Sequence, residues 1–350
     1  MQNGVSIVIC CHNSAKRLPD TLKYLACQNV DSSLPWEVVV VDNASNDGTS
    51  NIAQRCWPEK INVRLLVVHE PKAGLSQARM RGLRSARYDI VSYIDDDNWV
   101  SSDWLDTLVE VFSEDDKIGV VGGPSEAVFE TSPPPWFAEI QGYYAVGPQH
   151  EQSGDVTNAV GTILWGAGMS IRRAALNSLF DHGFEFLSTG RKGTQLLSGE
   201  DIEIGFALRA MGWQFKYDER LRIRHFMPAG RLTWSYARRL MRGMGMTSVY
   251  LTMYDGALRL PPFDKQPAYK RCWLFQFLKS VKNLTCHFLA HPICCITQTI
   301  GSKNALDFQR YLGILLQLLM VQSSYKSMIY NIESAPWNAP HRCGDVQTHT

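Results

Sequence analysis

Three consecutive aspartates, Asp95, Asp96 and Asp97, are the side chains in this 350-residue sequence whose types and spacing most clearly suggest chemistry. They follow directly on an apolar run, Ile90–Ile94, that is typical of a central strand. Carboxylates this close together repel one another, and a fold tolerates that repulsion where a cation or hydrogen-bond donors offset it. A single aspartate here would indicate a solvated turn, whereas three in a row favour a binding site for a cation.

A second acidic pair, Glu200 and Asp201, precedes a run with helical spacing. Acids at a helix start are favoured by capping and by the helix dipole, so a purely structural role is one interpretation. A catalytic role is the other, because a carboxylate within hydrogen-bond reach of a hydroxyl can remove its proton. His225 ends a short predicted strand, where a single histidine is as easily structural as functional.

The elements that must position these residues begin with alternating strand and helix patterns. Continuous apolar runs predict strands at Val5–Cys10, Glu37–Val41, Val63–Val68 and before Asp95, with a helical pattern after each. This alternation indicates an α/β fold with a mainly parallel sheet and flanking helices. Ligands of such sheets bind outside the carboxyl ends of the strands, which here carry His12, Asp42, Lys72 and the three aspartates. We therefore expect these side chains on one rim, where a nucleotide would lie.

The rest of the sequence divides into two parts and a tail. Trp213–Tyr217 and Leu221–His225 predict two short edge strands. Helical patterns follow at Trp234–Tyr254, Tyr269–Phe288 and Leu306–Tyr330. We expect a catalytic domain at 1–230, a basic helical region at 231–332 and a loose tail at 333–350.

Charge is distributed unevenly between these parts, although the net charge is only +1. Residues 1–230 carry 21 Lys+Arg against 29 Asp+Glu, and residues 231–350 carry 14 against 5. A basic section that contains aromatic residues suggests an anionic partner such as phosphate or a membrane surface, and we expect no nucleic-acid partner. The helix predicted from Trp234 begins a section that carries Arg231, Arg238, Arg239 and Arg242. One hypothesis is that this section meets anionic lipid or a lipid-diphosphate acceptor, and the alternative is a packed helix with solvated arginines.

The nine cysteines are odd in number and show no CxxC spacing, which indicates free thiols in a reducing compartment. We recognise no signal peptide, and no stretch is both long and apolar enough to suggest a membrane span. The prediction is a cytoplasmic protein, with peripheral contact at the cytoplasmic membrane face as a further hypothesis.

Six segments, taken together and in this order, resemble the family 2 glycosyltransferases of the GT-A fold. They are VSIVICCHNSAKRLPDTL, VVVVDNASNDGT, EPKAGLSQARMRGL, YIDDDNWV, WGAGMS and SGEDIEIGFALRAMGW, within residues 4–230. The resemblance implies transfer of a sugar from a nucleotide diphosphate to an acceptor hydroxyl, usually with inversion. One departure is Met80, where many relatives carry Asn.

The resemblance also implies residue roles. Asp201 would be the general base, with Glu200 binding donor or acceptor hydroxyls, although the two could be exchanged. Asp97 would bind a metal, with His225 as a second ligand or a phosphate contact. Asp96 belongs to the same donor motif, with an exposed or helix-capping role as the alternative. The remaining residues implied in nucleotide or donor binding are His12, Asn13, Ser14, Asp42, Lys72, Arg79, Asp95, Gly166, Ala167 and Gly168.

A metal suits this chemistry because a nucleotide diphosphate leaves poorly until its charge is compensated. Mn²⁺ or Mg²⁺ would do so as a Lewis acid, held by carboxylates. We expect a nucleotide-sugar donor, with UDP favoured by analogy with the class, and a glycan or lipid-linked sugar acceptor. Two alternatives remain open at this stage: a sugar-phosphate nucleotidyltransferase and a non-catalytic carbohydrate-binding relative.

Overall fold

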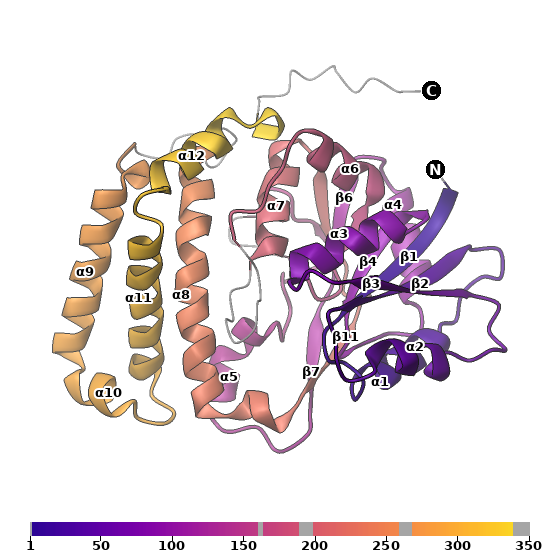
Figure 1. Cartoon of the computed structure of the whole chain (residues 1–350), viewed down its shortest axis with the longest axis horizontal. Coiled ribbons are helices and arrows are strands. Elements are labelled where there is room, and N and C mark those ends of the chain that lie inside the picture. Colours follow the sequence, from indigo (N-terminus) through magenta and orange to yellow (C-terminus); the bar gives the residue numbers. More distant parts are fainter. Residues whose placement is uncertain (1, 160–163, 189–198, 259–267, 339–350) are drawn as a thin grey trace.

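The computed structural model describes residues 2–159, 164–188, 199–258 and 268–338. An α/β part, built around a twisted sheet, lies beside a layer of long helices (Figure 1). The sheet has eight strands in the order β3-β2-β1-β4-β9-β6-β10-β8. Its first four neighbours, β3 (Arg64–Glu70), β2 (Trp36–Asn43), β1 (Gln2–Cys11) and β4 (Tyr88–Asp95), are all parallel.

This arrangement confirms the predicted α/β class with a mainly parallel sheet. The departures from parallel pairing are β9 (Ser170–Arg172), which runs antiparallel to β4 and to β6 (Ile118–Gly122), and the short β8 (Gly154–Asp155). The central register pairs Cys10 of β1 with Asp95 of β4, so both reach the same edge of the sheet.

Helices cover both faces of the sheet because the side chains of its strands alternate between the two. In β1, Val8 faces the core that contains α3 (Leu75–Ser85), whereas Ile7 and Ile9 face the core that contains α1 (Leu18–Ala26). The other helices of this part are α2 (Thr49–Cys56), α4 (Trp104–Ser113), α5 (Phe137–Ile140), α6 (Arg173–Asp181) and α7 (Glu200–Ala210).

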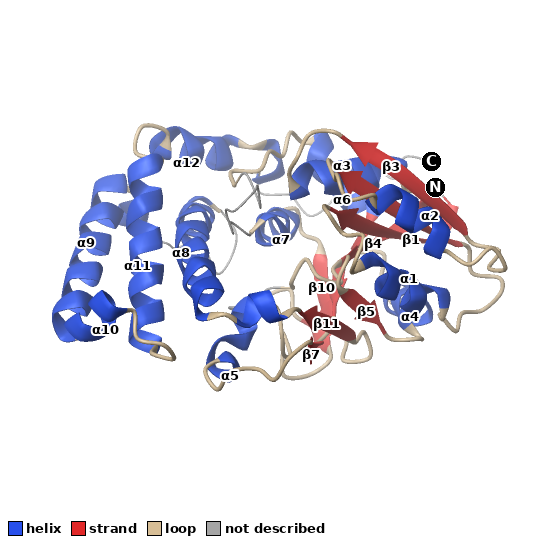
Figure 2. Cartoon of the chain, turned by 60° about the horizontal axis from the view of Figure 1, so that its bottom comes forward, coloured by secondary structure: helices blue, strands red, loops and turns tan. Residues whose placement is uncertain are grey.

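The prediction of two edge strands near the end of this part was wrong. β10 (Gln214–Tyr217) lies inside the main sheet, between β6 and β8. β11 (Ile223–Met227) is the middle strand of a second, three-stranded sheet, between β5 (Asn98–Val100) and β7 (Ser125–Phe129) (Figure 2). Both strands are short, and their partners are far away in sequence, from Lys216 paired with Asp155 to Ile223 paired with Val100, so local periodicity could not identify their place.

The helical part consists of α8 (Trp234–Ala257), α9 (Trp273–Ala290), α10 (Pro292–Thr297), α11 (Lys303–Met320) and α12 (Tyr325–Ser334). α8 and α11 touch backbone to backbone at Gly245 and Gly313. A Cβ on Gly313 would lie 2.1 Å from the carbonyl oxygen of Arg242, so this contact needs glycine. α8 is therefore an internal helix, packed on α11 along one side and facing the α/β part on the other (Figure 1).

Two predictions for the C-terminal region need correction. The single helix expected at Leu306–Tyr330 is two helices, since the chain turns after Met320 and α12 begins at Tyr325. The tail expected to be loose from Glu333 is packed as far as Asn338. Trp337 is buried against Tyr254, and the Asn338 side chain donates to the carbonyl of Ala257. Residues 339–350 of that tail lie outside the described residues.

Candidate active site

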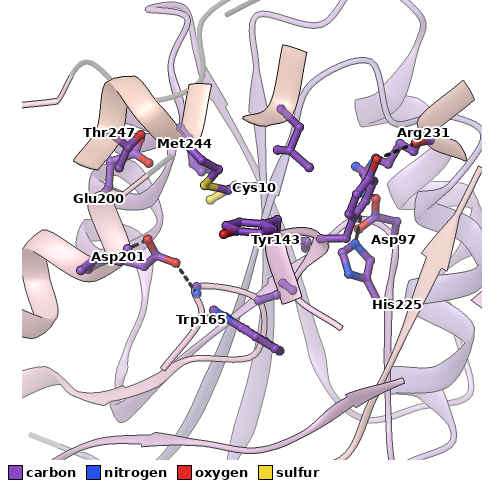
Figure 3. Close-up of a pocket in the computed structure, with 18 of the residues that line it drawn as sticks. Cys10, Asp97, Tyr143, Trp165, Glu200, Asp201, His225, Arg231, Met244 and Thr247 are labelled. Carbon is purple, nitrogen blue, oxygen red and sulfur yellow. Dashed lines mark hydrogen bonds and ion pairs between the residues drawn. The ribbon is translucent and has the colours of Figure 1, made fainter. Parts of the chain in front are cut away.

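A cleft with a volume of about 820 Å³ opens where β1 and β4 end, between the sheet and α8 (Figure 3). Most of the residues implied by the sequence line it: His12, Arg79, Asp95, Asp96, Asp97, Gly166, Ala167, Glu200, Asp201 and His225. Asp201 and Glu200 lie on one side of this space, and Asp97 and His225 lie on the other (Figure 3).

Asp96 is buried rather than exposed, which corrects the alternative considered for it. Asp95 ends β4, and Asp96 and Asp97 form the turn that leads into β5. Asp96 turns inward to an ion pair of 2.7 Å with Arg17. Its main-chain oxygen accepts a hydrogen bond from Thr21 Oγ1 at 2.9 Å. Burial, and then the neighbouring Asp97, raise the pKa of Asp96 despite Arg17. Asp96 thus anchors the turn to α1 as well as lining the cleft.

Asp97 contacts a cation that belongs to the protein. Arg231 Nη2 lies 2.8 Å from Asp97 Oδ2, and Arg231 Nη1 lies 3.0 Å from His225 Nε2. The pairing of β5 with β11 brings His225 to within 3.5 Å of Asp97 Oδ1. Burial lowers the pKa of His225, although Asp97 acts to raise it. The lowered pKa favours the neutral ring. Burial also acts to lower the pKa of Arg231, but Asp97, Tyr236, Asp96 and Asp95 together leave that pKa raised.

Whether a divalent ion fits this wall of the cleft depends on the side chains of Asp97, His225 and Arg231. Within the described part of the chain, no group of three or more His, Cys, Asp or Glu side chains is arranged to hold a metal. Mg²⁺ and similar ions usually take only one or two protein carboxylates and complete their shell with water and substrate phosphate. Asp97 and His225 supply one oxygen and one nitrogen on the same wall of the cleft, which fits such a site once Arg231 moves away from them.

On the opposite wall, Asp201 is held by the glycine-containing segment after residue 163. Its Oδ2 accepts a hydrogen bond of 2.7 Å from the backbone N–H of Gly166. A Cβ on Gly166 would lie only 2.3 Å from a guanidinium nitrogen of Arg79 and 3.1 Å from Asp201 Oδ2. The glycine therefore allows three groups to meet in one place. Asp201 stays partly exposed, whereas Glu200 beside it is only 1% exposed.

Arg79 is the buried cation of this wall. Burial acts to lower its pKa, but the carboxylates of Glu200, Asp201 and Asp95 together leave that pKa raised. Its guanidinium carbon lies 5.7 Å from the centre of the Tyr93 ring. A permanently charged, planar donor is thus fixed between the first aspartate and the acidic pair.

Five residues implied in donor binding do not line the cleft in this structure: Asn13, Ser14, Asp42, Lys72 and Gly168. Asp42 is occupied by its own loop, because its carboxylate accepts from Ser45 N at 3.2 Å and from Ser50 Oγ. Burial would raise the pKa of Asp42, but these hydrogen bonds lower it. Gly168 is a packing residue, since a Cβ there would lie 2.0 Å from Ile223.

Asn13, Ser14 and Lys72 also have other surroundings. Asn13 Oδ1 accepts a hydrogen bond from the backbone N–H of Asn46 at 2.9 Å, and the backbone N–H of Ser14 donates to Thr49 Oγ1 at 2.9 Å. Both residues therefore connect the loop after β1 to the loop after β2. Lys72 is exposed. Asn43, the neighbour of Asp42, lines the cleft in its place.

Residues 6–180, half of the chain, match the family model described as Glycosyl transferase family 2. The chain belongs to this family. It is a glycosyltransferase with a GT-A fold, and the expectation drawn from the six sequence segments is confirmed.

Curated relatives extend the similarity beyond the matched half. The chain is 27% identical over 244 residues to the succinoglycan biosynthesis protein ExoM of Rhizobium meliloti, covering 68% of this chain and 72% of that protein. It is 24% identical over 287 residues to the glucosyl-dolichyl phosphate glucuronosyltransferase of Haloferax volcanii, covering 80% and 86%.

A solved structure agrees with the fold. The mannosyltransferase PcManGT of Pyrobaculum calidifontis, in complex with GDP-Man and Mn²⁺, superposes with a TM-score of 0.55 at 18% sequence identity, over 93% of this chain and 88% of that one.

Sequence reasoning missed two arginines and one wall of the glycosyltransferase cleft. Arg231 was assigned to the basic C-terminal section, although it stands only six residues after His225 on the same rim. Nothing in the sequence around Arg17, apart from its place after the first strand, indicates that it lines the cleft. The third omission is the α8 wall, which includes Leu240, Met244 and Leu251.

Proposed function

We propose that the protein is an inverting glycosyltransferase that moves a sugar from a nucleotide diphosphate to a hydroxyl of a glycan or lipid-linked acceptor. UDP is the favoured nucleotide of the donor. The observation that carries the proposal is the arrangement of two carboxylate groups on opposite sides of one cleft, Asp201 facing Asp97 across it (Figure 3). A direct displacement needs this separation, because the acceptor must attack the sugar from the side opposite the leaving nucleotide.

On the donor side, His12 and Asn43 line the end of the cleft next to β2, where a base and ribose would lie. The diphosphate would then meet the Asp97 wall, where Arg231 supplies a guanidinium that can form two parallel hydrogen bonds with phosphate oxygens. Asp97 and His225 would hold Mn²⁺ or Mg²⁺ there, and the ion would supply Lewis-acid compensation of the leaving charge. By analogy, the Mn²⁺ in the PcManGT complex supports a metal ion on this wall. The UDP-GlcNAc in a complex of S. aureus TarS supports a UDP-sugar donor.

On the acceptor side, Asp201 is the general base. It is partly exposed to the cleft, and its orientation is fixed by the Gly166 N–H, whereas Glu200 is almost fully enclosed. A base must reach the attacking hydroxyl, so the exposed member of the pair takes this role and Glu200 orders the hydroxyls around it. Base catalysis of this kind contributes roughly 10²–10⁴-fold to the rate.

Two substitutions test these assignments, with UDP-sugar turnover and UDP binding measured in Mn²⁺. Asp201→Asn should keep UDP binding and lose transfer by at least about 100-fold. Asp97→Asn should lose the part of UDP binding that depends on Mn²⁺. Asp116→Asn, a fully exposed aspartate, is the matched control and should change neither. Transfer at the normal rate by the Asp201 variant would refute the base assignment.

We also propose contact with an anionic membrane surface, on α9 and α10 rather than on α8. Two of the arginines that first suggested α8 have other partners, because Arg231 lies in the cleft and Arg242 donates to Gln309 of α11. Residues 268–306 contain five Lys+Arg and no Asp or Glu. In the same stretch Leu289, Ile293, Ile296 and Ile300 are each 70–74% exposed. Exposed apolar groups beside basic ones fit the surface of an anionic bilayer.

The membrane proposal is tested by flotation with vesicles of phosphatidylglycerol or phosphatidylcholine. We expect binding to the anionic vesicles that weakens with salt, and loss of binding in the double variant Ile293→Ser, Ile296→Ser. Tyr330→Ser, which alters an exposed apolar residue on α12, is the control. Equal flotation of both variants would exclude the α10 surface. No described helix is long and apolar enough to cross a membrane.

A further inference from the structure

A second cavity, of about 320 Å³, lies among the helices of the C-terminal part. α8 contributes Ser248 and Thr252, α9 contributes Lys279 and Ser280, α11 contributes Arg310, and Tyr325 stands at the start of α12. Its volume is at the lower end of the range for small-molecule sites, which suits a small polar group better than a large ligand.

The charged and hydroxyl groups of this cavity are mostly hydrogen-bond donors. Lys279 and Arg310 are its two cations, and none of the described residues that line it carries a carboxylate. Asp307 is 3.6 Å from the guanidinium of Arg310 but does not line the cavity. An excess of donors without a carboxylate acceptor is the chemistry that recognises an anion.

Two of the hydroxyl groups are buried without a partner. Ser280 is 5% exposed and Tyr325 is 1% exposed, and neither hydroxyl has a hydrogen-bond partner among the described residues; the same holds for Nε of Arg310. Burial, and then Cys272, raise the pKa of Tyr325 to about 12, so its hydroxyl remains a neutral donor. Buried polar groups are normally hydrogen-bonded, because leaving one unpaired costs about 1–3 kcal/mol.

We propose that this cavity is a binding site for a phosphate or diphosphate group, held by Lys279, Arg310 and the hydroxyls of Ser280 and Tyr325. The unpaired donors then have a common acceptor, and Lys279 gains a counter-ion that none of the described lining residues supplies. The anion is part of the acceptor substrate, and this identification rests on the proposed transferase function.

Continuity with the catalytic cleft supports that identification. Ser248 and Arg310 line both cavities, so a molecule bound by its phosphate in the smaller one extends into the larger one along α8. It enters on the side of Thr247 and Glu200, next to Asp201, whereas Asp97 and Arg231 lie on the far side (Figure 3). The site for the acceptor phosphate is therefore distinct from the one proposed for the donor diphosphate.

Direct binding to the full chain tests the site without using transfer. Inorganic diphosphate is titrated by calorimetry with UDP at saturation, so that the donor end of the cleft is already filled. We expect binding by the native protein and an affinity about tenfold lower in the double variant Lys279→Gln, Ser280→Ala, since charge-assisted hydrogen bonds are lost. Lys282→Gln, the next lysine on α9 and one that does not line the cavity, should bind as the native protein does.

Tyr325→Phe keeps the ring in the core and removes only the hydroxyl, so it should also weaken binding while urea unfolding stays close to that of the native protein. Geranyl diphosphate distinguishes the sources of the anion: tighter binding than diphosphate identifies a lipid headgroup, and equal binding identifies a small phosphate compound. Absence of diphosphate binding, or equal affinity in the double variant and the native protein, overturns the site. Failure of the transferase assignment would instead appear as absence of UDP-sugar turnover by the native protein, with diphosphate binding unaffected.

Discussion

The ion pair between Arg231 and Asp97 should make a large contribution to stability, and the two residues should not act independently. The two side chains are 2.8 Å apart, and that of Asp97 is only 1% exposed. Removing one member of a buried pair leaves the other charge without compensation, at a cost of about 3–5 kcal/mol. Since the Arg231 side chain is 23% exposed, water reduces this penalty, and we expect about 3 kcal/mol for Arg231→Gln and a similar loss for Asp97→Asn.

The double variant separates a true pair from two unrelated effects. With both charges gone, no buried charge is left alone, so the double variant should also lose about 3 kcal/mol rather than the sum of about 6. The coupling energy is then about 3 kcal/mol. Urea unfolding followed by tryptophan fluorescence, in EDTA and without nucleotide, measures all three values. Arg84→Gln, an exposed arginine on α3, is the control and should change stability by less than about 0.5 kcal/mol.

Additive losses in the double variant would refute the reasoning, because they would mean that Arg231 and Asp97 stabilise the fold through different neighbours. Losses below about 0.5 kcal/mol in both single variants would refute it in another way, since the pair would then behave as an exposed one.

Three further predictions concern other parts of the protein. Burial raises the pKa of Glu203 from 4.5 to about 7, so the folded state binds the proton of this carboxyl more tightly than the unfolded state does. The free energy of unfolding should therefore fall by about 3 kcal/mol between about pH 4.5 and 7 and then level off. Urea unfolding of Glu203→Gln should lack this fall. Gly313→Ala should cost about 2 kcal/mol in urea unfolding because its Cβ forces α8 and α11 apart, whereas Gly142→Ala, with open space around it, should be neutral. Gly166→Ala should lower kcat/KM for transfer by about 100-fold, by displacing Arg79 and Asp201, with stability retained.

The order of strands and helices in the first half could be predicted because it depends on local patterns. The apolar runs of β1, β2 and β4 are buried on both faces, and such strands have a continuous hydrophobic signal. The second sheet could not be predicted, since β11 is defined by its neighbours β5 and β7 and not by its own five residues. The end of α11 was missed for a related reason, as the apolar pattern continues through the turn into α12.

The candidate site was predictable where a residue ends a strand of the sheet and faces its open edge. Asp95 and His12 follow this rule, and both line the cleft. Asp42 also lies at the end of a strand, β2, but Ser45 comes three residues later and donates its backbone N–H to the Asp42 carboxylate, as in an Asx turn. That signal was present in the sequence. Arg231 gave no local signal, because a 3-10 turn after β11, Ala229–Leu232, folds it back on Asp97.

The charges of the cleft suggest how the glycosyltransferase keeps three adjacent aspartates stable before any ligand arrives. Two of these carboxylates are paired with an arginine, Asp96 with Arg17 and Asp97 with Arg231. Asp95 shares the field of Arg79 with Glu200 and Asp201, which act on that arginine more strongly. The repulsion that first suggested a bound cation is thus already offset by the protein. A metal ion held by Asp97, as proposed, would therefore compete with Arg231, and a donor diphosphate would favour the exchange because it would offer the displaced guanidinium new oxygens to bind. Metal and donor should accordingly strengthen each other's binding, since coupling between two ligands is reciprocal.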